Sequence, residues 1–236
     1  MATSGVTTWT LNKDQVIAAA LRKLTVLPSG VSPSVTQIAD ATVALNAMLK
    51  GYQTDGMPLW AIKEYSFVTT ANVSDYLIGV GQTLNTPMPL KLLQAYRSGT
   101  GFSKVPMNVY AKYDYNLLPL NNSEGTPVNL AYQPFSTYGT LSIWPLPMDD
   151  SNTIGIRYQR PFEDMVSASD DFDFPSYWME AIIYGLAVRL APEYGTSLEE
   201  RQLLLKEAST FREQALSFGT EEASLYFQPD WVNRHG

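Results

Sequence analysis

Apolar residues recur at helical spacing near the start of the chain. Asn12 and Gln15 form a capping-box pattern, and the apolar stripe that follows predicts a helix that stops at Pro28. A second helix is expected to begin at Ser32 and Pro33, because proline is well tolerated at the first helical position. The chain therefore opens with two helices.

The same helical spacing returns near the end of the chain. A helix is predicted over 175–191, and Ser197 with Glu200 forms a second capping box before a long helix over 197–218. Five apolar positions step by four and three residues along that last helix. These positions are Leu204, Ala208, Phe211, Ala215 and Phe218.

Between these helices, residues 61–163 show short segments of alternating apolar and polar residues, broken by Gly, Pro and Asn. Such segments are typical of β-strands. The segment 110–118 is predicted to form a short helix. The expected strands are 64–70, 73–81, 91–97, 127–134, 140–147 and 153–161.

The order of these elements predicts an α+β fold. Helices from both chain ends most simply pack together, because each must bury its apolar stripe against another element. The predicted organisation is an N-terminal arm (1–10), a helical bundle (11–60 and 164–218), an inserted β-rich domain (61–163) and an extended C-terminal docking tail (219–236).

The predicted helix 175–191 is apolar on almost every side. Its only charged residues are Glu180 and Arg189, nine positions apart, which places them about half a turn out of phase and prevents them from pairing with each other. A helix of this kind is normally enclosed. We expect a neighbouring subunit to complete its burial and one of the two charges to pair across that contact; the alternative is that Arg189 pairs with Glu193 and Glu180 is simply exposed.

The tail 219–236 has no helical period beyond about residue 223 but holds several large apolar side chains. Aromatic residues in a non-periodic segment are the residue types that anchor protein interfaces. We expect this tail to dock on a partner through Leu225, Tyr226, Phe227 and Trp231. The alternative is a tail that folds onto its own subunit.

Composition supports an assembled protein. Charged residues make up only 17% of the chain, Tyr is abundant at 14 residues, and the net charge is −7. Interfaces favour Tyr and Trp, whereas nucleic-acid-binding domains need a basic face. There is no Cys, which fits synthesis in a reducing cytoplasm. No apolar run reaches the roughly 18 residues of a membrane span, so no membrane contact is expected.

Candidate catalytic residues are few. The only histidine, His235, is the second-last residue, where no scaffold would hold a catalytic base. Adjacent acids at Glu163–Asp164 and Asp149–Asp150 leave a cell-wall hydrolase as an alternative, because paired carboxylates can cleave sugars. The prediction is a protein that is not an enzyme, with no cofactor and no metal site.

Taken together, these segments resemble the head-to-tail adaptors of short-tailed bacteriophages, the family of tail accessory factors and tail tubular protein A. No single stretch is diagnostic, but their order and spacing cover about residues 11–231. The stretches are "LNKDQVIAAALRKL", "ADATVALNAMLKGYQTDGMPLW", "GTLSIWPLP", "IRYQRPFEDM", "DFPSYWMEAIIYGLAVRLAPEYG" and "YFQPD".

The resemblance implies a structural virion protein at the head-tail junction, without catalysis. Members of this family form a twelve-subunit ring beneath the portal, extend the DNA channel used in genome ejection, and offer a platform to the next tail protein, the nozzle. The helical part and the C-terminal tail face the portal, and the β-rich part faces the tail. The resemblance therefore implies portal or neighbour-subunit contacts for Leu225, Tyr226, Phe227 and Trp231. Another ring position, as a nozzle or a stopper, is a second alternative.

Overall fold

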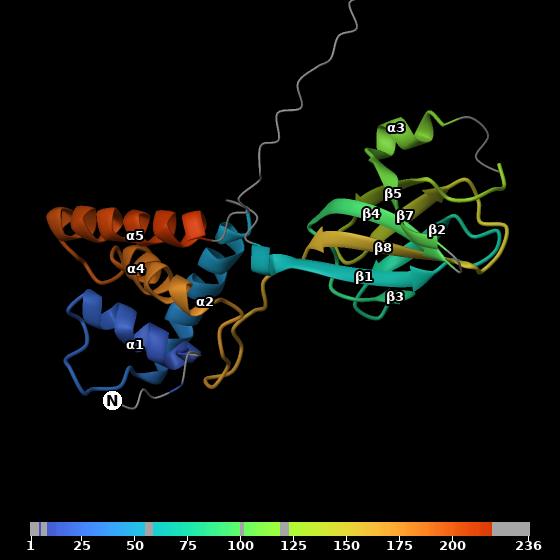
Figure 1. Ribbon diagram of the computed structural model, residues 1–236. Coiled ribbons are helices and arrows are strands. Elements are labelled where there is room, and N and C mark those ends of the chain that lie inside the picture. The colour runs from blue at the N-terminus through green and yellow to red at the C-terminus, as the bar shows by residue number, and fades with distance from the viewer. Residues whose placement is uncertain (1–4, 6–8, 55–58, 100–101, 119–122, 219–236) are drawn as a thin grey trace, which may run out of the picture.

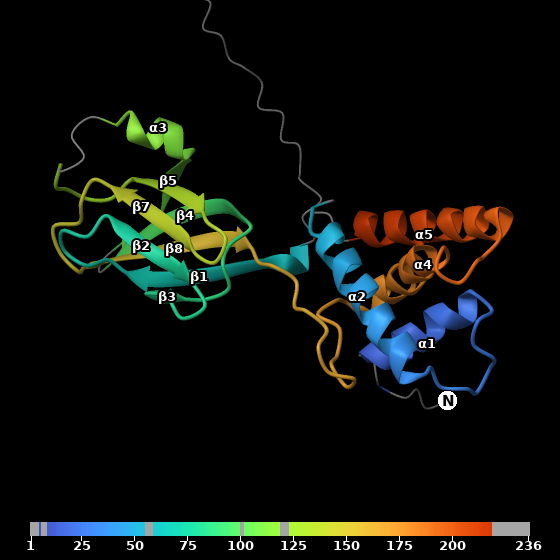
Figure 2. The ribbon, with the colours of Figure 1, turned by 180° about the vertical axis from the view of Figure 1, so that it is seen from behind.

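The computed structural model describes residues 5, 9–54, 59–99, 102–118 and 123–218. In this part of the chain the molecule is elongated, with the four long helices at one end and the strands, together with one short helix, at the other (Figure 1). The view from behind shows the same separation, bridged by the start of β1 (Ile62–Val68) and by the segment after β8 (Asn152–Gln159) (Figure 2). The mixed α+β class is confirmed, and the domain boundaries stay a prediction.

The helical end is built around one central helix. α4 contacts all three of the other long helices, and eight of its twelve residues are buried. One hydrophobic cluster contains buried side chains from all four helices. They are α1 (Lys13–Lys23), α2 (Val35–Tyr52), α4 (Met179–Leu190), which follows a 3₁₀ turn at Ser176–Trp178, and α5 (Leu198–Phe218).

Side-chain caps fix where these helices begin. Gln15 N–H donates to the Asn12 side chain at 2.9 Å, and the Glu200 N–H donates to Ser197 Oγ at 3.3 Å, so both predicted capping boxes are confirmed. The predicted start of the second helix at Ser32 is wrong. Its cap is Ser34, because a capping box needs a glutamine three residues later, and Gln37 occupies that position.

The first helix also ends earlier than predicted. Thr25 has a φ of 58°, a left-handed conformation that a helix cannot continue through, so α1 stops at Lys23. Leu24 and Leu27 are still buried, since the chain folds back over the cluster after the turn.

The strand end contains an eight-stranded sheet in the order β1-β8-β4-β5-β6-β7-β2-β3. β5 pairs with β6, and β2 with β3, in parallel; the other pairs are antiparallel. The remaining strands are β2 (Asp75–Gly79), β3 (Leu84–Asn85), β4 (Lys91–Gly99), β5 (Phe102–Tyr110), β6 (Asn129–Pro134) and β7 (Gly139–Trp144).

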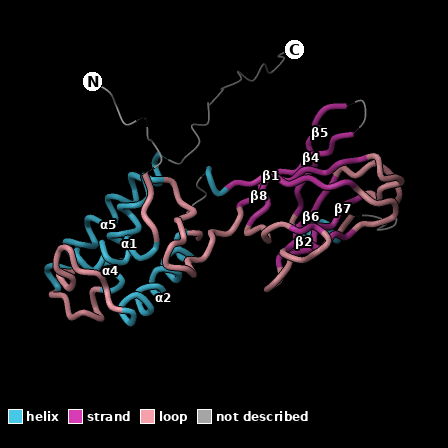
Figure 3. Tube along the Cα trace, turned by 90° about the horizontal axis from the view of Figure 1, so that it is seen from below, coloured by secondary structure: helices cyan, strands magenta, loops and turns pink. Residues whose placement is uncertain are grey.

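The sheet curls around a core of its own. Phe67 of β1 and Tyr76 of β2 belong to strands near opposite ends of the sheet, yet their ring centroids are 4.8 Å apart. All eight strands contribute to this second hydrophobic cluster, in which Ile143 and Tyr158 are fully buried. The tube view shows the curled strands beside the helices (Figure 3). The predicted helix at 110–118 is real but shorter, α3 (Lys112–Asn116).

Candidate interaction surfaces

Aromatic side chains fill the place where the two ends of the molecule meet. The ring of Trp60, just before β1, stacks on Phe162 at 4.9 Å between centroids and contacts Phe174 at 4.8 Å. Phe174 in turn lies 4.7 Å from Phe162 and 5.8 Å from Trp178. We call these four residues the aromatic junction.

An ion pair closes the same region. The Arg160 guanidinium donates two hydrogen bonds to the Asp173 carboxylate, of which the one from Nη2 is 2.7 Å long. This pairing raises the pKa of Arg160. Both side chains are only about a fifth exposed, so the pair is partly shielded from water. The Arg160–Asp173 pair joins the segment that follows β8 to the segment that precedes α4.

The last two turns of α2 hold the segment after β8 by polar contacts. Asn46 exchanges two 2.9 Å hydrogen bonds with the backbone of Met165, and Lys50 donates to the Phe162 carbonyl at 2.8 Å. Lys50 also pairs with Asp164 at 2.7 Å. With the aromatic junction, these contacts tie the helices to the strands. This region was not predicted from the sequence, although aromatic residues at the boundary of the strand segment were a usable signal.

We expect Asp173→Ala to lower the free energy of unfolding by about 1.5–3 kcal/mol, because it leaves the partly buried Arg160 guanidinium without its acceptor. The matched control is Asp164→Ala, whose pair with Lys50 is more exposed and should cost about 1 kcal/mol or less. Urea unfolding of both variants measures the difference. If both variants lose the same free energy of unfolding, the Arg160–Asp173 pair does not stabilise the protein more than the exposed pair does.

Both predicted intersubunit charges lie at the surface of α4. Glu180 and Arg189 are exposed, and neither forms an ion pair with any residue that the structure describes. The alternative pair of Arg189 with Glu193 is not formed. Helices of the same chain cover α4, so its apolar character does not itself require a neighbouring subunit. The intersubunit role of the two charges stays a prediction.

Large apolar side chains are exposed on several elements. On α2, Val35 is 83% and Val43 73% exposed. Phe218, expected on the buried stripe of α5, is exposed at the helix end and packs only edgewise on Tyr177, with 4.9 Å between ring centroids. Single exposed apolar residues are ordinary on protein surfaces, whereas those that form a contiguous patch are typical of surfaces that bind another protein.

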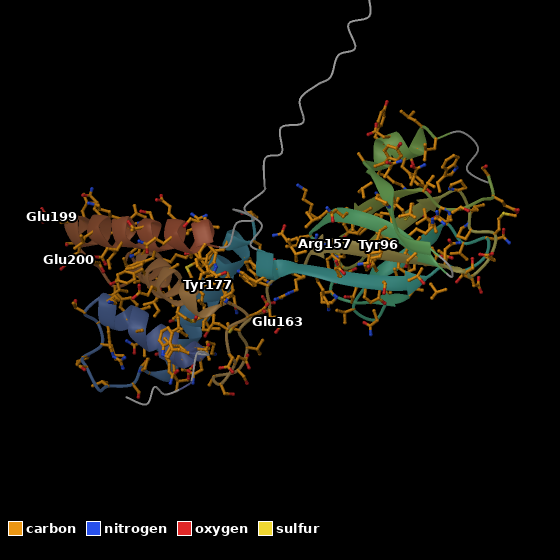
Figure 4. All side chains as sticks on the ribbon, in the orientation of Figure 1. Tyr96, Arg157, Glu163, Tyr177, Glu199 and Glu200 are labelled. Atoms are coloured by element: carbon orange, nitrogen blue, oxygen red, sulfur yellow. The ribbon has the colours of Figure 1, made fainter. Side chains whose placement is uncertain are left out.

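A polar network covers one outer face of the sheet. Arg157 on β8 lies between Glu64 on β1, at 3.5 Å, and Gln94 on β4, at 3.3 Å. The Lys104 ammonium lies 4.1 Å from the centre of the Tyr96 ring. Tyr96 and Arg157 are side by side on this face in Figure 4. These contacts bridge four neighbouring strands and stabilise the outer face.

A family model described as SU10 adaptor protein matches residues 11–224. The chain belongs to the SU10 adaptor protein family. This family comprises phage head-to-tail adaptors, so the predicted resemblance is confirmed. The comparison with curated proteins found no match.

Membership of the SU10 adaptor family assigns a structural role in the phage tail. The family is not an enzyme family, and it implies a place in the virion and assembly with portal and tail proteins. None of the helices in the described part of the chain has the length and apolarity needed to cross a membrane. The described residues also contain no group of three or more potential metal ligands.

Three of the four acidic residues in the two candidate pairs of this adaptor have structural partners. The Asp149 carboxylate accepts hydrogen bonds from the Ser151 hydroxyl and N–H, which lower its pKa, whereas a general acid needs a raised pKa. Asp150 accepts from the Ala71 N–H at 2.7 Å. Asp164 pairs with Lys50, as described above, and Glu163 points outward from the region between the two ends of the molecule (Figure 4). These contacts do not favour the hydrolase alternative.

The predicted tail contacts Leu225, Tyr226, Phe227 and Trp231, together with His235, lie outside the described residues. The last described residue, Phe218, lies beside Tyr177 at the start of the α4 segment.

Proposed function

We propose that this SU10-family adaptor forms a ring of twelve copies that joins the portal to the tail and extends the DNA channel. The observation that carries this proposal is the family match across residues 11–224. A ring needs two different contact surfaces on each copy, and the exposed apolar faces of the helices supply candidates for them.

In this proposal the two ends of the molecule serve different partners. The helical bundle (11–60 and 164–218) faces the portal, and the β-rich domain (61–163) faces the nozzle protein. The separate hydrophobic clusters support such a division, and the aromatic junction would hold the two surfaces in a constant relative orientation. At the outer end of the strands, α3 offers Tyr113 and Leu117, 74% and 68% exposed, as apolar contacts for the nozzle.

The proposed tail contacts complete the attachment to the portal. Leu225, Tyr226, Phe227 and Trp231 would bury against the portal or a neighbouring adaptor, and the arm 1–10 would lie on another subunit. DNA would pass through the ring without specific binding. The net charge of −7 per copy fits this role, because an acidic ring does not neutralise phosphates and so does not hold DNA.

The test is the mass of the complex that purified adaptor forms with purified portal, measured by native mass spectrometry. We expect a complex with twelve adaptor copies on each portal ring, whether or not the adaptor alone is monomeric. A complex in which single adaptor chains bind without contacting one another, in variable number, would contradict the ring.

A further inference from the structure

A groove runs over α4 between α2 and α5. Its volume is about 200 Å³, Gly185 and Val188 form its floor, and Met48 and Leu205 are on its walls. A side chain larger than hydrogen at position 185 would collide with Tyr52 and Met48, so the glycine keeps α2 and α4 close under the groove. We call it the Arg189 groove.

Every charged side chain among the described residues that line the groove is positive. Arg189 and Arg212 are its two charged side chains, and no acidic side chain lines it. Arg212 packs on the Tyr52 ring, 5.2 Å from its centre. Arg189 makes no hydrogen bond or ion pair with a described residue. In a chain of net charge −7, an apolar groove with an unpaired guanidinium fits an apolar surface that carries a carboxylate.

The outer side of α2 is such a surface. Val35, Ala39, Val43 and Ala47 follow one another at four-residue intervals and are all exposed, and we call them the valine ridge. Ridges of this spacing are the ones that pack into grooves between helices. Asp40 is exposed beside the ridge and forms no ion pair with a described residue.

We propose that the valine ridge of one copy lies in the Arg189 groove of the next copy, where Asp40 pairs with Arg189. This inference rests on the proposed ring and names its subunit contact. The ridge and the groove are different surfaces of one chain, so the contact is head-to-tail, the type that closes into a ring. Val43 and Met48 are five residues apart, about 140° around α2, so one copy can use both surfaces at once.

A second copy fits better than the portal as occupant because both complementary surfaces are on this chain. One unpaired carboxylate matches one unpaired guanidinium, and one exposed apolar ridge matches one apolar groove. Docking of the portal in the groove would leave the valine ridge, with Val35 83% exposed, in contact with water. Each copy in a ring covers both surfaces.

The test is charge reversal followed by rescue. Asp40→Arg and Arg189→Asp should each raise at least tenfold the adaptor concentration needed to form rings on the portal, and the double variant should restore assembly to near the level of the original chain. Glu199→Arg, an exposed charge in the first turn of α5 that does not line the groove, is the matched control. Assembly is measured by native mass spectrometry, and circular dichroism checks that each variant is folded.

The outcomes separate this contact from the ring itself. If both single variants assemble like the original chain, or if the double variant is not rescued, the Asp40–Arg189 pairing is overturned while the ring stands. If the original chain forms no ring on the portal, both proposals fail.

A second measurement does not depend on charge. The chain contains no Cys, so Val43→Cys combined with Val188→Cys introduces the only two thiols. Mild oxidation of assembled rings should give a ladder of disulfide-linked oligomers. The control pair is Tyr113→Cys with Val188→Cys, which joins the groove to the exposed α3 at the other end of the molecule. A ladder no stronger than that of the control pair would overturn the contact.

Discussion

Phe174→Ala is expected to lower the free energy of unfolding by about 3–5 kcal/mol, the usual cost of removing a buried phenylalanine side chain. The Phe174 ring is buried and contacts Trp60, Phe162 and Trp178. Its loss leaves a cavity where the helices meet the strands, and the polar contacts around Arg160 cannot close that cavity. Urea unfolding, followed by tryptophan fluorescence and by circular dichroism, measures the effect.

The matched control is Phe135→Ala. Phe135 is 44% exposed, and its ring contact is with Tyr138 at 5.1 Å between centroids. This variant should lose about 1 kcal/mol or less, because little apolar area returns to water. If the two variants lose equal stability, the aromatic junction is not the main connection between the two ends of the molecule.

The second large effect is expected when the C-terminal tail is removed, and it concerns attachment of the adaptor to the portal. We expect a chain that ends at Phe218 to remain folded but to lose attachment to the portal. Leu216 is the last described residue in the helical hydrophobic cluster, so the truncation keeps every described side chain of that cluster. The removed segment contains Leu225, Tyr226, Phe227 and Trp231, and aromatic anchors of this kind carry most of the binding free energy in many interfaces.

Co-sedimentation with portal rings measures this loss, and circular dichroism measures folding. A full-length chain with those four residues changed to Ser should fail in the same way, whereas Gln228→Ala with Asn233→Ala should bind normally. Unfolding of the truncated chain would show that the tail belongs to its own subunit. Attachment at the original level would show that the tail does not dock.

Local signals in the sequence predicted local structure well. The capping boxes at Asn12 and Ser197 involve residues three apart, so a short stretch determines each helix start. The predicted start at Ser32 was wrong because a proline at the first helical position is only compatible with a helix start, whereas Gln37 forms a capping box with Ser34. The all-apolar pattern of 175–191 predicted its burial correctly but not that its own chain covers it.

The junction depends on contacts that no local pattern contains. Lys50 and the Phe162 carbonyl are separated by 112 residues, and Asn46 and Met165 by 119. Only folding of the strand segment brings these residues together. The Arg189 groove is of the same kind, since its walls come from α2 and α5. The periodicity of apolar residues identifies the apolar side of each helix, but it does not show which helices pack against each other.

A cryo-electron microscopy map of the virion tests the central claim most directly. The account predicts a continuous ring of this chain between the portal and the rest of the tail, with the helical ends toward the head, the strand ends toward the nozzle and an open channel along the axis. A map that shows this chain at the far tip of the tail, or as separate copies that do not contact one another, would contradict the proposed ring.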